Sequence, residues 1–563
     1  MNAADYLILI GTLVGIAAYA IWSTRSRRDL SAYLMGGGSG WLTIGLSVMA
    51  TQASAITFLS TPGQGYDSGL GFVQNYFGAP LALIVVASVF LPIYRRLKVY
   101  TAYEYLGHRF DSKTRLLGAG LFLLQRGLGA GITIYAPAIV LSTVMGWRLD
   151  ATIICSGLLV ILYTVCGGCD AVSLTQKYQI GVIFAGMASA FVVLLCRLPA
   201  GLSLSDSLAL AGGMHRLGAV DFSLSPDRRY TFWSGTLGGM FLALSYFGTD
   251  QSQVQRYLGG GSLRDGRLGL MFNALFKVPM QIFILLLGVL IFVFYQFERP
   301  PVFFNRAAWD HELAHGGASA LAPVKARFDA AFADEKAQIA RWLEARHSGD
   351  TRAEAGAKAA ALEAEGRVEA AHAEAGRLVK AGGGGASAND NDYVFITFIL
   401  DHLPHGLIGL LVTAFFAAAL SSKAAELNAL GSSTTIDVYR HIARPGLPDS
   451  HYLSASRWFT ALWGLVAIAF ALFANLSENL IQAVNILGSV FYGVVLGIFL
   501  VAFFFKRIGG TPVFWGALGA QALVFLLYGR LPISYLWYNV IGCAACLALS
   551  AVLQAALPAR RTA

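Results

Sequence analysis

Long apolar segments dominate the chain. A helix that crosses a bilayer needs about 20 predominantly apolar residues. Thirteen segments approach or exceed that length: 6–23, 41–61, 70–94, 116–145, 149–166, 178–196, 231–249, 268–296, 405–422, 457–476, 481–505, 514–528 and 532–557. They lack the alternating pattern of an outer-membrane barrel. The pattern therefore predicts an all-α integral membrane protein with about 13 transmembrane helices.

Basic residues indicate how these helices are oriented. Clusters of Lys and Arg recur in every second loop, at 25–28, 95–98, 256–267, 440–444 and 506–507. The opposite loops carry few, apart from the long segment 297–392. Because basic loops stay in the cytoplasm, we predict an N-terminus outside and a C-terminus inside. We therefore expect a multi-pass protein of the bacterial inner membrane.

The segment 297–392 differs from the rest in composition. It holds 12 of the 41 Lys and Arg residues and 15 of the 32 Asp and Glu residues. Apolar residues recur at helical spacing within 320–381, and His347-Ser-Gly-Asp350 is typical of a turn, so we expect a helical hairpin. A Gly-rich linker follows up to Asn391. We favour a solvated spacer that packs on the outer face; the alternative is a module that captures substrate or a partner.

Composition narrows the function classes. The 563 residues are 56% hydrophobic and only 13% charged, about half the charge of a soluble chain. The basic excess is dispersed over short loops, which excludes the clustered basic face of a nucleic-acid-binding protein. Cys166-Gly-Gly-Cys169 and Cys543-Ala-Ala-Cys546 have redox-motif spacing, but we interpret them as small residues at helix contacts. Composition indicates the lipid bilayer as a partner and leaves the oligomeric state open, a monomer included.

Two apolar segments are interrupted. In 41–61 and just beyond it, Pro62-Gly63 is expected to prevent a regular helix, and in 231–249 the interruption lies at Gly248 and Asp250. If 41–196 and 231–510 are two five-helix halves, these are the first helices of each half. Paired interruptions at matching positions mark the binding site of many transporters, because unwound backbone frees carbonyl and amide groups.

Charged residues within membrane helices are costly and need a role. Lys423, Glu426 and Asp250 serve either in a substrate or ion pathway, or in internal pairs of opposite charge. For Arg126 and Lys277 we favour a functional role, because no acid close in sequence pairs with either.

Several motifs, in order, are similar to those of the sodium:solute symporter family. They are Ser54-Ala-Ile-Thr-Phe-Leu-Ser-Thr-Pro62, Tyr100-Thr-Ala-Tyr-Glu-Tyr-Leu-Gly-His-Arg-Phe110, Ile134-Tyr-Ala-Pro-Ala138, Tyr163-Thr-Val-Cys-Gly-Gly168, Phe247-Gly-Thr-Asp-Gln-Ser-Gln-Val-Gln-Arg256 and Ala417-Ala-Ala-Leu-Ser-Ser422. The resemblance covers about residues 1–300 and 390–510, and the iodide, vitamin and monocarboxylate branch looks nearest.

The resemblance implies a LeuT-like five-plus-five inverted repeat with extra flanking helices. The first repeat is 41–196, and the second comprises 231–296 and 393–510. Residues 1–40 hold a preceding helix and a cytoplasmic loop. Residues 297–392 are an extracytoplasmic helical insert, and 511–563 hold two C-terminal helices.

The resemblance also implies a sodium site. The matching positions are the backbone carbonyls of Ala50, Ala53 and Ala418 and the hydroxyls of Ser421 and Ser422. Neutral oxygens suit Na⁺, a hard cation. By themselves, the two serines could equally bond back to their own helix.

In the sugar-transporting branch, the substrate lies beside this sodium site. The matching positions here are Gln52, Thr57, Tyr76, Tyr246, Phe247, Lys277 and Gln482, with Asn485 one turn further. Arg126 lies about one turn from the carboxylate-binding arginine of sialic-acid transporters, which favours an anionic substrate.

Two departures from the family pattern concern a second sodium site. Gln176 stands where many members have an acid, and Ala424 and Ala425 stand where two-sodium members have serines. Both changes remove oxygen ligands, so we predict one Na⁺ per substrate, with Glu426 as a conceivable compensation.

The sequence therefore predicts a sodium-coupled symporter that imports a small organic solute, such as a sugar, carboxylate, sialic acid or vitamin-like compound, by alternating access. Alternatives are an inorganic-anion symporter and a transporter-like sensor. No signalling domain follows residue 557, so a sensor would need a separate partner. The spans lack a catalytic motif, so we expect no enzyme and no catalytic residues.

Overall fold

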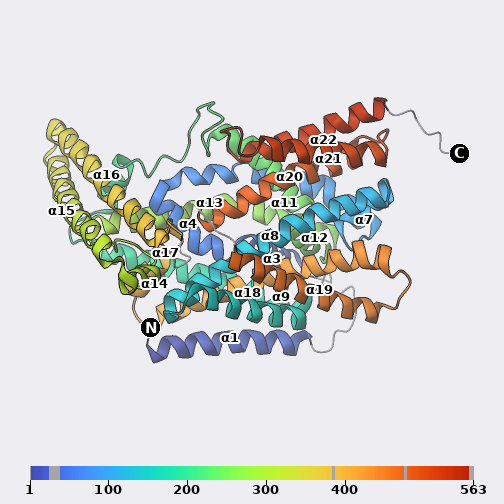
Figure 1. Ribbon diagram of the computed structural model, residues 1–563, viewed down its shortest axis with the longest axis horizontal. Helices are drawn as coiled ribbons and strands as arrows, with labels where there is room; N and C mark the ends of the chain where they lie inside the picture. The colour runs from blue at the N-terminus through green and yellow to red at the C-terminus, as the bar shows by residue number, and fades with distance from the viewer. Residues whose placement is uncertain (1, 25–38, 383–386, 474–477, 557–563) are drawn as a thin grey trace.

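The computed structural model describes residues 2–24, 39–382, 387–473 and 478–556, and these form helices and loops with one isolated bridge between Ser39 and Gly260. Most helices run side by side in a bundle, with α1 (Ala3–Thr24) along one edge and a long hairpin at one end (Figure 1). Within these ranges, nine helices are long and apolar enough to cross a membrane. An all-helical membrane architecture is confirmed.

The first half of the bundle contains two helices in line, followed by shorter segments and two long helices. In order these are α3 (Trp41–Gln52), α4 (Ala55–Ser68), the 3₁₀ helix η1 (Gly69–Tyr76), α5 (Ala79–Val85), the π-helical η2 (Val86–Phe90), α6 (Leu91–Leu97), α7 (Ala102–Arg109), α8 (Ser112–Met145), α9 (Leu149–Arg197) and α10 (Leu204–Gly213).

The second half begins with another interrupted helix and contains the long hairpin. Its elements are η3 (Ser234–Gly238), α11 (Gly239–Gly248), α12 (Gln251–Leu258), α13 (Leu263–Tyr295), α14 (Arg306–Glu312), η4 (Leu313–Gly317), α15 (Ala318–Ser348), α16 (Thr351–Ala381), α17 (Asn391–His402), α18 (Leu407–Ser433), η5 (Thr434–Ala443), α19 (Asp449–Phe473) and α20 (Leu480–Phe504). Two helices, α21 (Gly510–Leu527) and α22 (Leu536–Ala556), follow.

The first interruption lies nine residues before the predicted position. The backbone leaves the helix at Ala53 and is extended at Ser54, whereas Pro62 lies inside α4. The prediction from Pro62-Gly63 was therefore wrong. Gly63 lies so close to the next elements that a Cβ there would be 1.9 Å from the carbonyl oxygen of Asn391. The Pro-Gly pair thus permits close helix packing instead of ending the helix.

The second interruption lies where the sequence predicted it. α11 ends at Gly248, and the Asp250 carboxylate accepts a 2.9 Å hydrogen bond from the backbone N–H of Ser252. This hydrogen bond caps α12 and satisfies one of its free amide groups.

Two predicted boundaries differ from the structure. Residues 149–166 and 178–196 were expected as separate helices, but the backbone is helical throughout α9; the Cys166–Cys169 side chains lie outside the described part. The helix expected to end at residue 422 continues to Ser433 as α18. This continuation places Lys423 and Glu426 inside a buried helix, where each supplies the other's counter-charge.

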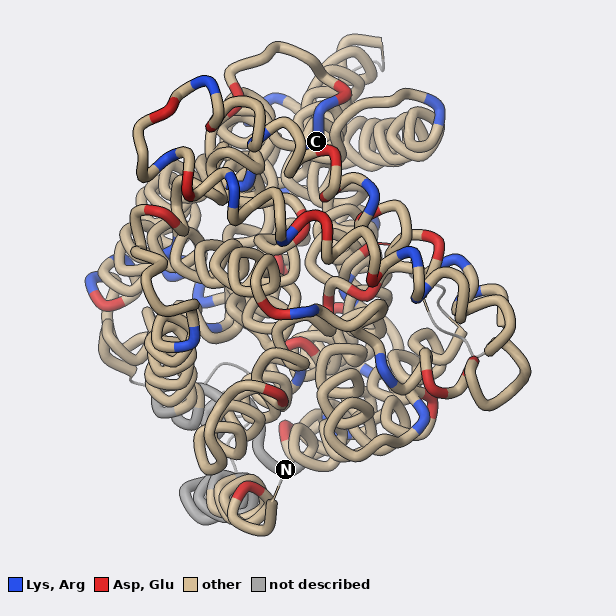
Figure 2. The backbone as a smooth tube through the Cα atoms, turned by 90° about the vertical axis from the view of Figure 1, so that its left-hand side faces the viewer, with Lys and Arg blue, Asp and Glu red and all other residues tan. Residues whose placement is uncertain are grey.

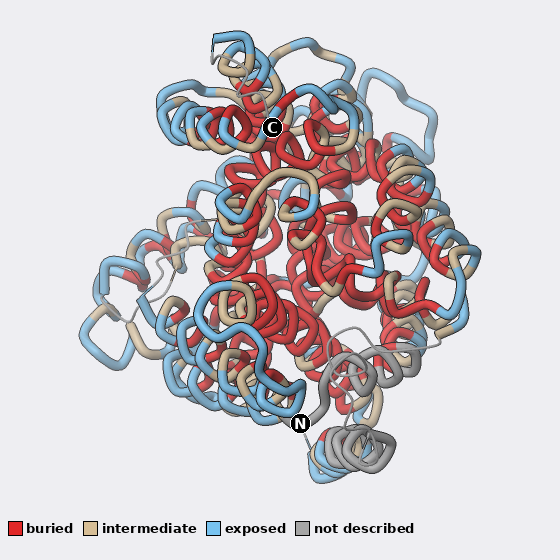
Figure 3. The backbone as a smooth tube through the Cα atoms, turned by 90° about the vertical axis from the view of Figure 1, so that its right-hand side faces the viewer, coloured by how far each residue is buried: buried red, intermediate tan, exposed pale blue. Residues whose placement is uncertain are grey.

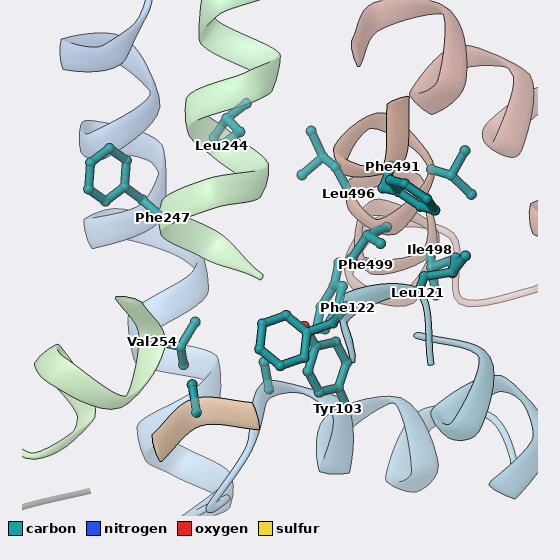
Figure 4. Packing of buried hydrophobic residues seen from close by; sticks show 14 of the residues in the cluster. Tyr103, Leu121, Phe122, Leu244, Phe247, Val254, Phe491, Leu496, Ile498 and Phe499 are labelled. Carbon is teal, nitrogen blue, oxygen red and sulfur yellow. The ribbon is translucent and has the colours of Figure 1, made fainter. Parts of the chain in front are cut away.

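The core lies along the centre of the bundle. Viewed from the end opposite the hairpin, buried residues occupy the middle and exposed residues the periphery (Figure 3). Phe247 on α11 and Val254 on α12 belong to the same apolar cluster as Tyr103, Phe122 and Phe499 (Figure 4). Both parts of the interrupted helix are therefore held by packing from other helices.

The hairpin predicted over 320–381 is present as α15 and α16. Gly349 adopts a left-handed conformation (φ +73°) at the end of α15, and the Asp350 carboxylate caps α16. Trp342 and Ile339 are buried against α10 and α13. Figure 2 looks onto this end of the bundle, where acidic and basic residues are interspersed. The hairpin thus packs on the bundle through an apolar stripe and exposes charged residues elsewhere.

Close packing of α4 on α13 is testable at Gly288. A Cβ at Gly288 would lie 2.0 Å from the carbonyl oxygen of Pro62, so we expect Gly288→Ala to destabilise the protein by about 1–3 kcal/mol. The measurement is thermal unfolding of the purified protein in detergent. Gly120→Ala is the control, because a Cβ there meets nothing within 4 Å. Equal melting temperatures for the two variants would contradict this packing.

Candidate functional site

The end of α3 lies against α18 at the position of the predicted sodium site. The Ser422 hydroxyl donates a 3.3 Å hydrogen bond to the carbonyl oxygen of Thr51, and the Ser421 hydroxyl donates one of 3.2 Å to the carbonyl oxygen of Ala418. Ala50 and Ala53 flank Thr51 and are buried. Because α3 stops here, its last carbonyls lack helical partners. The site therefore offers neutral oxygens, which fit Na⁺.

Transition-metal chemistry is not indicated at this position. Among the residues that the structure describes, no group of three or more His, Cys, Asp or Glu side chains is arranged to hold a metal ion. A sodium site of carbonyl and hydroxyl oxygens does not need such a group.

Gln176, predicted to replace an acid of a second sodium site, is buried between α9 and α3. Its side-chain oxygen accepts a 2.7 Å hydrogen bond from Ser47, and its amide nitrogen donates one of 3.2 Å to the Thr51 hydroxyl. Ala424 and Ala425 are fully buried and supply no side-chain oxygen. The amide of Gln176 thus connects α9 to α3 through two hydrogen bonds.

A cavity of about 90 Å³ lies beside the predicted sodium site, between the two interruptions. Seven of the nine residues predicted to bind substrate line it: Gln52, Thr57, Tyr76, Arg126, Tyr246, Phe247 and Asn485. Thr51 also lines this cavity. One residue therefore borders both the predicted ion site and the cavity.

Lys277 and Gln482 do not line this cavity. The Lys277 ammonium is buried behind it, 4.5 Å from the centre of the Tyr76 ring. Gln482 accepts a hydrogen bond from Arg229 and donates one to the Tyr230 hydroxyl, each 3.2 Å long. Lys277 contacts the cavity wall through Tyr76, whereas Gln482 belongs to a separate polar cluster.

Four buried charges form a network at one side of the cavity. Arg126 forms ion pairs with Asp250 and, at 3.2 Å, with Glu426. Lys423 pairs with the other oxygen of Glu426 at 2.6 Å. Two positive and two negative charges balance within it. The network joins α8, α18 and the interruption between α11 and α12.

The pairing of Arg126 differs from the sequence-based interpretation. Lys423 and Glu426 form an ion pair, which is the internal pairing that the sequence offered as an alternative to a pathway role. Arg126 has no acidic partner close in sequence, as predicted, but it pairs with acids 124 and 300 residues away. An acid near in sequence is therefore not needed to neutralise a charge in a membrane helix.

Several residues at the cavity were not predicted from the sequence. Tyr492 donates a 3.1 Å hydrogen bond to Asp250, and Thr133 donates one of 3.1 Å to Glu426. Asn75 also lines the cavity. No local motif marks these positions, although the polar residues Thr133 and Asn75 within apolar segments are a weak signal.

Three buried polar atoms of the cavity residues have no hydrogen-bond partner within the described ranges. They are the side-chain oxygen of Gln52, Nε of Arg126 and the side-chain nitrogen of Asn485. An unpartnered buried polar group is costly, so these atoms are suited to a ligand. One accepts and two donate, which fits a solute that carries both donors and acceptors.

Comparison with known families agrees with this geometry. A model of the "Sodium:solute symporter family" matches residues 33–304 and 375–519, more than half of the chain. The unmatched stretch between them contains α15 and most of α16. The family match therefore covers α3 to α13 and α17 to α20, and it excludes most of the hairpin as well as α1 and α22.

Three curated transporters are similar in sequence. Sodium-coupled monocarboxylate transporter 1 of Xenopus laevis is 27% identical over 526 residues, covering 92% of this chain and 71% of that protein. The sodium/iodide cotransporter of Homo sapiens is 33% identical over 302 residues, covering 52% of this chain and 46% of its own length. The sodium/sialic acid symporter SiaT of Proteus mirabilis is 24% identical over 552 residues, covering 96% and 92%.

One solved structure has the same fold over nearly the whole chain. It is the substrate-bound, outward-open state of a Na⁺-coupled sialic acid symporter, with a TM-score of 0.76, 21% identity and coverage of 99% of this chain and 98% of that one. This likeness confirms the predicted fold class.

The charge network is testable at its centre. Arg126→Met leaves the buried Asp250 without a cation, and we expect it to cost about 3–5 kcal/mol of stability. The measurement is the free energy of unfolding in mixed micelles. Arg148→Met is the matched control, because Arg148 pairs with Asp150 on the exposed surface, where a pair contributes about 0–1 kcal/mol. Similar losses in both variants would contradict a structural role for the network.

Proposed function

The chain belongs to the sodium:solute symporter family, and we propose that it couples Na⁺ bound by Ala50, Ala53, Ala418, Ser421 and Ser422 to the import of a solute bound in the central cavity. The family and the similar transporters make it a sodium-coupled membrane transporter and not an enzyme. We place it in the bacterial inner membrane with the predicted orientation.

Thr51 connects the proposed ion site to the solute cavity. Its carbonyl oxygen accepts a hydrogen bond from the Ser422 hydroxyl, and its own hydroxyl accepts one from the side-chain amide of Gln176. Thr51 also lines the cavity. An ion that draws α18 and the end of α3 together therefore also orders one wall of the solute cavity. Energetic coupling between adjacent sites is what alternating access requires.

The chemistry of the cavity favours a small polar organic solute. The charge network is balanced, so the cavity offers no excess positive charge to a bare inorganic anion. Instead, unpartnered donors on Arg126 and Asn485 and an unpartnered acceptor on Gln52 fit a solute with both hydroxyl and carboxylate or carbonyl groups. We therefore propose hydroxylated carboxylates and sugar acids first, and simple sugars second.

The sodium site is testable by counterflow in proteoliposomes. We expect Na⁺-dependent exchange of one member of a labelled panel of sugars, hydroxycarboxylates, sialic acid and iodide. Ser421→Ala/Ser422→Ala should weaken Na⁺ activation at least about tenfold, since two of five ligands are lost. Ser432→Ala is the control, because the hydroxyl of this buried serine of α18 donates a hydrogen bond to the carbonyl of Asn428, within its own helix.

The outcomes separate the candidate functions. Exchange that ignores Na⁺, or an unchanged Na⁺ response in the double variant, would refute the sodium site. Exchange of iodide alone would replace the organic solute by an inorganic anion. Na⁺ binding without exchange of any solute would favour a sensor that acts through a separate partner.

The number of coupled ions is a separate prediction. Gln176 fills the second position with an amide, and Ala424 and Ala425 offer no hydroxyl. We therefore expect one Na⁺ per solute, measured as the reversal potential of solute flux under opposing Na⁺ gradients. A ratio of two would show that other oxygens, such as those of Glu426, complete a second site.

A further inference from the structure

A second cavity, of about 450 Å³, lies between the hairpin and the end of the bundle. Its walls come from the end of α4, the end of α13, and both hairpin helices. It shares no lining residue with the central cavity. Its size is within the range of small-molecule sites in proteins.

Aromatic side chains form the apolar part of this cavity. The ring of Tyr66 meets those of Phe292, Tyr295 and Phe304 at centroid distances of 5.8, 6.2 and 5.5 Å, each near perpendicular. Phe328 and Phe332 of α15 line the opposite side. The rings provide both apolar surface and the electron-rich faces that attract cations.

Carboxylates outnumber cations in the same space. Arg216 pairs with Glu365 at 3.0 Å and with Glu369 at 2.9 Å, so one guanidinium serves two acids. Glu335 also lines the cavity, is only 2% exposed, and has no ion-pair partner among the described residues. The cavity therefore holds more carboxyl groups than cationic groups.

His372 does not supply the missing positive charge. Its two ring nitrogens lie 2.9 Å from the carbonyl oxygen of Val302 and 3.0 Å from the carboxylate of Asp390. Both partners are acceptors, so the ring is protonated, and the pKa of His372 is raised by Asp390 despite the opposing effect of burial. Its charge is thus balanced by Asp390.

Three buried oxygen atoms in this cavity lack hydrogen-bond partners within the described ranges. They are one carboxylate oxygen of Glu335, the amide oxygen of Gln296 and the hydroxyl of Tyr295. Each can accept a hydrogen bond. Burial and the nearby Glu365 and Glu369 raise the pKa of Glu335 to about 8. Without a cation this carboxyl is therefore held partly protonated near neutral pH.

We propose that this cavity is a binding site for a protonated organic amine with an aromatic or aliphatic body. The ammonium donates to the free oxygens of Glu335, Gln296 and Tyr295, and the body packs on the rings around Tyr66. A bare metal ion fits less well, since no group of three or more metal-binding side chains is arranged around one point in the described chain. The site does not depend on the solute or ion of the central cavity.

The test is titration calorimetry of the full chain in lipid nanodiscs, with phenethylammonium as the probe. 2-Phenylethanol is the neutral isostere, and empty nanodiscs correct for partitioning into lipid. We expect saturable binding of the amine and at least about tenfold weaker binding of the alcohol, because a hydrogen bond to a charged group is lost.

Glu335→Gln keeps the shape of the side chain and removes its charge. We expect at least about tenfold weaker amine binding and an equal or higher melting temperature without amine, since repulsion from Glu365 and Glu369 is relieved. Glu363→Gln is the matched control, because Glu363 lies on α16 with a 78% exposed side chain. Its amine affinity should stay within about twofold of the parent chain.

The pH dependence provides an independent readout. The titratable groups around Glu335 are Glu365 and Glu369 with Arg216, Asp67, the His372–Asp390 pair, and Tyr66 and Tyr295. Since the amine binds the ionised form of Glu335, amine affinity should rise from about pH 6 to about pH 9. Glu335→Gln should lose most of this rise.

Three results would overturn the proposal: equal amine affinity in the parent chain and Glu335→Gln, equal affinity for the alcohol and the amine, or no heat above that of empty nanodiscs. If Glu335→Gln fails to fold, Tyr295→Phe serves instead. It removes one unpartnered hydroxyl, and we expect about threefold to tenfold weaker amine binding. Unchanged binding in this variant would also contradict the site.

Discussion

The centre of the structure depends on the ion pairs of Arg126 with two buried acids. Arg126 pairs with Asp250 at the interruption of one helix and with Glu426 inside α18. Lipid offers no water to stabilise a charge, so each of these groups requires the others. Asp250 can cap α12 only because Arg126 neutralises its carboxylate. The interruption, and with it the cavity, therefore depends on a guanidinium supplied by a different helix.

The first interruption has a different physical basis. At Ala53 and Ser54 the helix stops, and some of the freed backbone groups bind protein side chains. The Ser422 hydroxyl, for example, donates a hydrogen bond to the carbonyl oxygen of Thr51. The proposed Na⁺ would add what the hydroxyls cannot, a positive charge shared by several oxygens. The second interruption thus uses a resident ion pair, whereas the first is the one proposed to bind a mobile ion, so we expect only the first to respond to sodium.

The hairpin illustrates how a polar insert can join an apolar bundle. Trp342 and Ile339 anchor α15 on α10 and α13, and a second cavity lies between the hairpin and the bundle. Because the family match leaves out residues 305–374, the cavity combines bundle residues with residues of an added element. A transporter with such a site could sense a second small molecule without altering its central cavity.

Local physical chemistry explains what the sequence by itself determined. Hydropathy indicated an all-helical membrane protein, the Gly248–Asp250 pattern located one interruption, and Gly349-Asp350 located the turn of the hairpin, since each depends on neighbouring residues. Tertiary structure alone decided that Pro62 stays within a helix, because Gly288 and Gly63 let other elements approach it. It also decided the partners of Arg126 and placed Glu335, Tyr295 and Gln296 around one cavity. These groups are far apart in the chain, and only packing brings together charges and oxygen atoms that no local pattern connects.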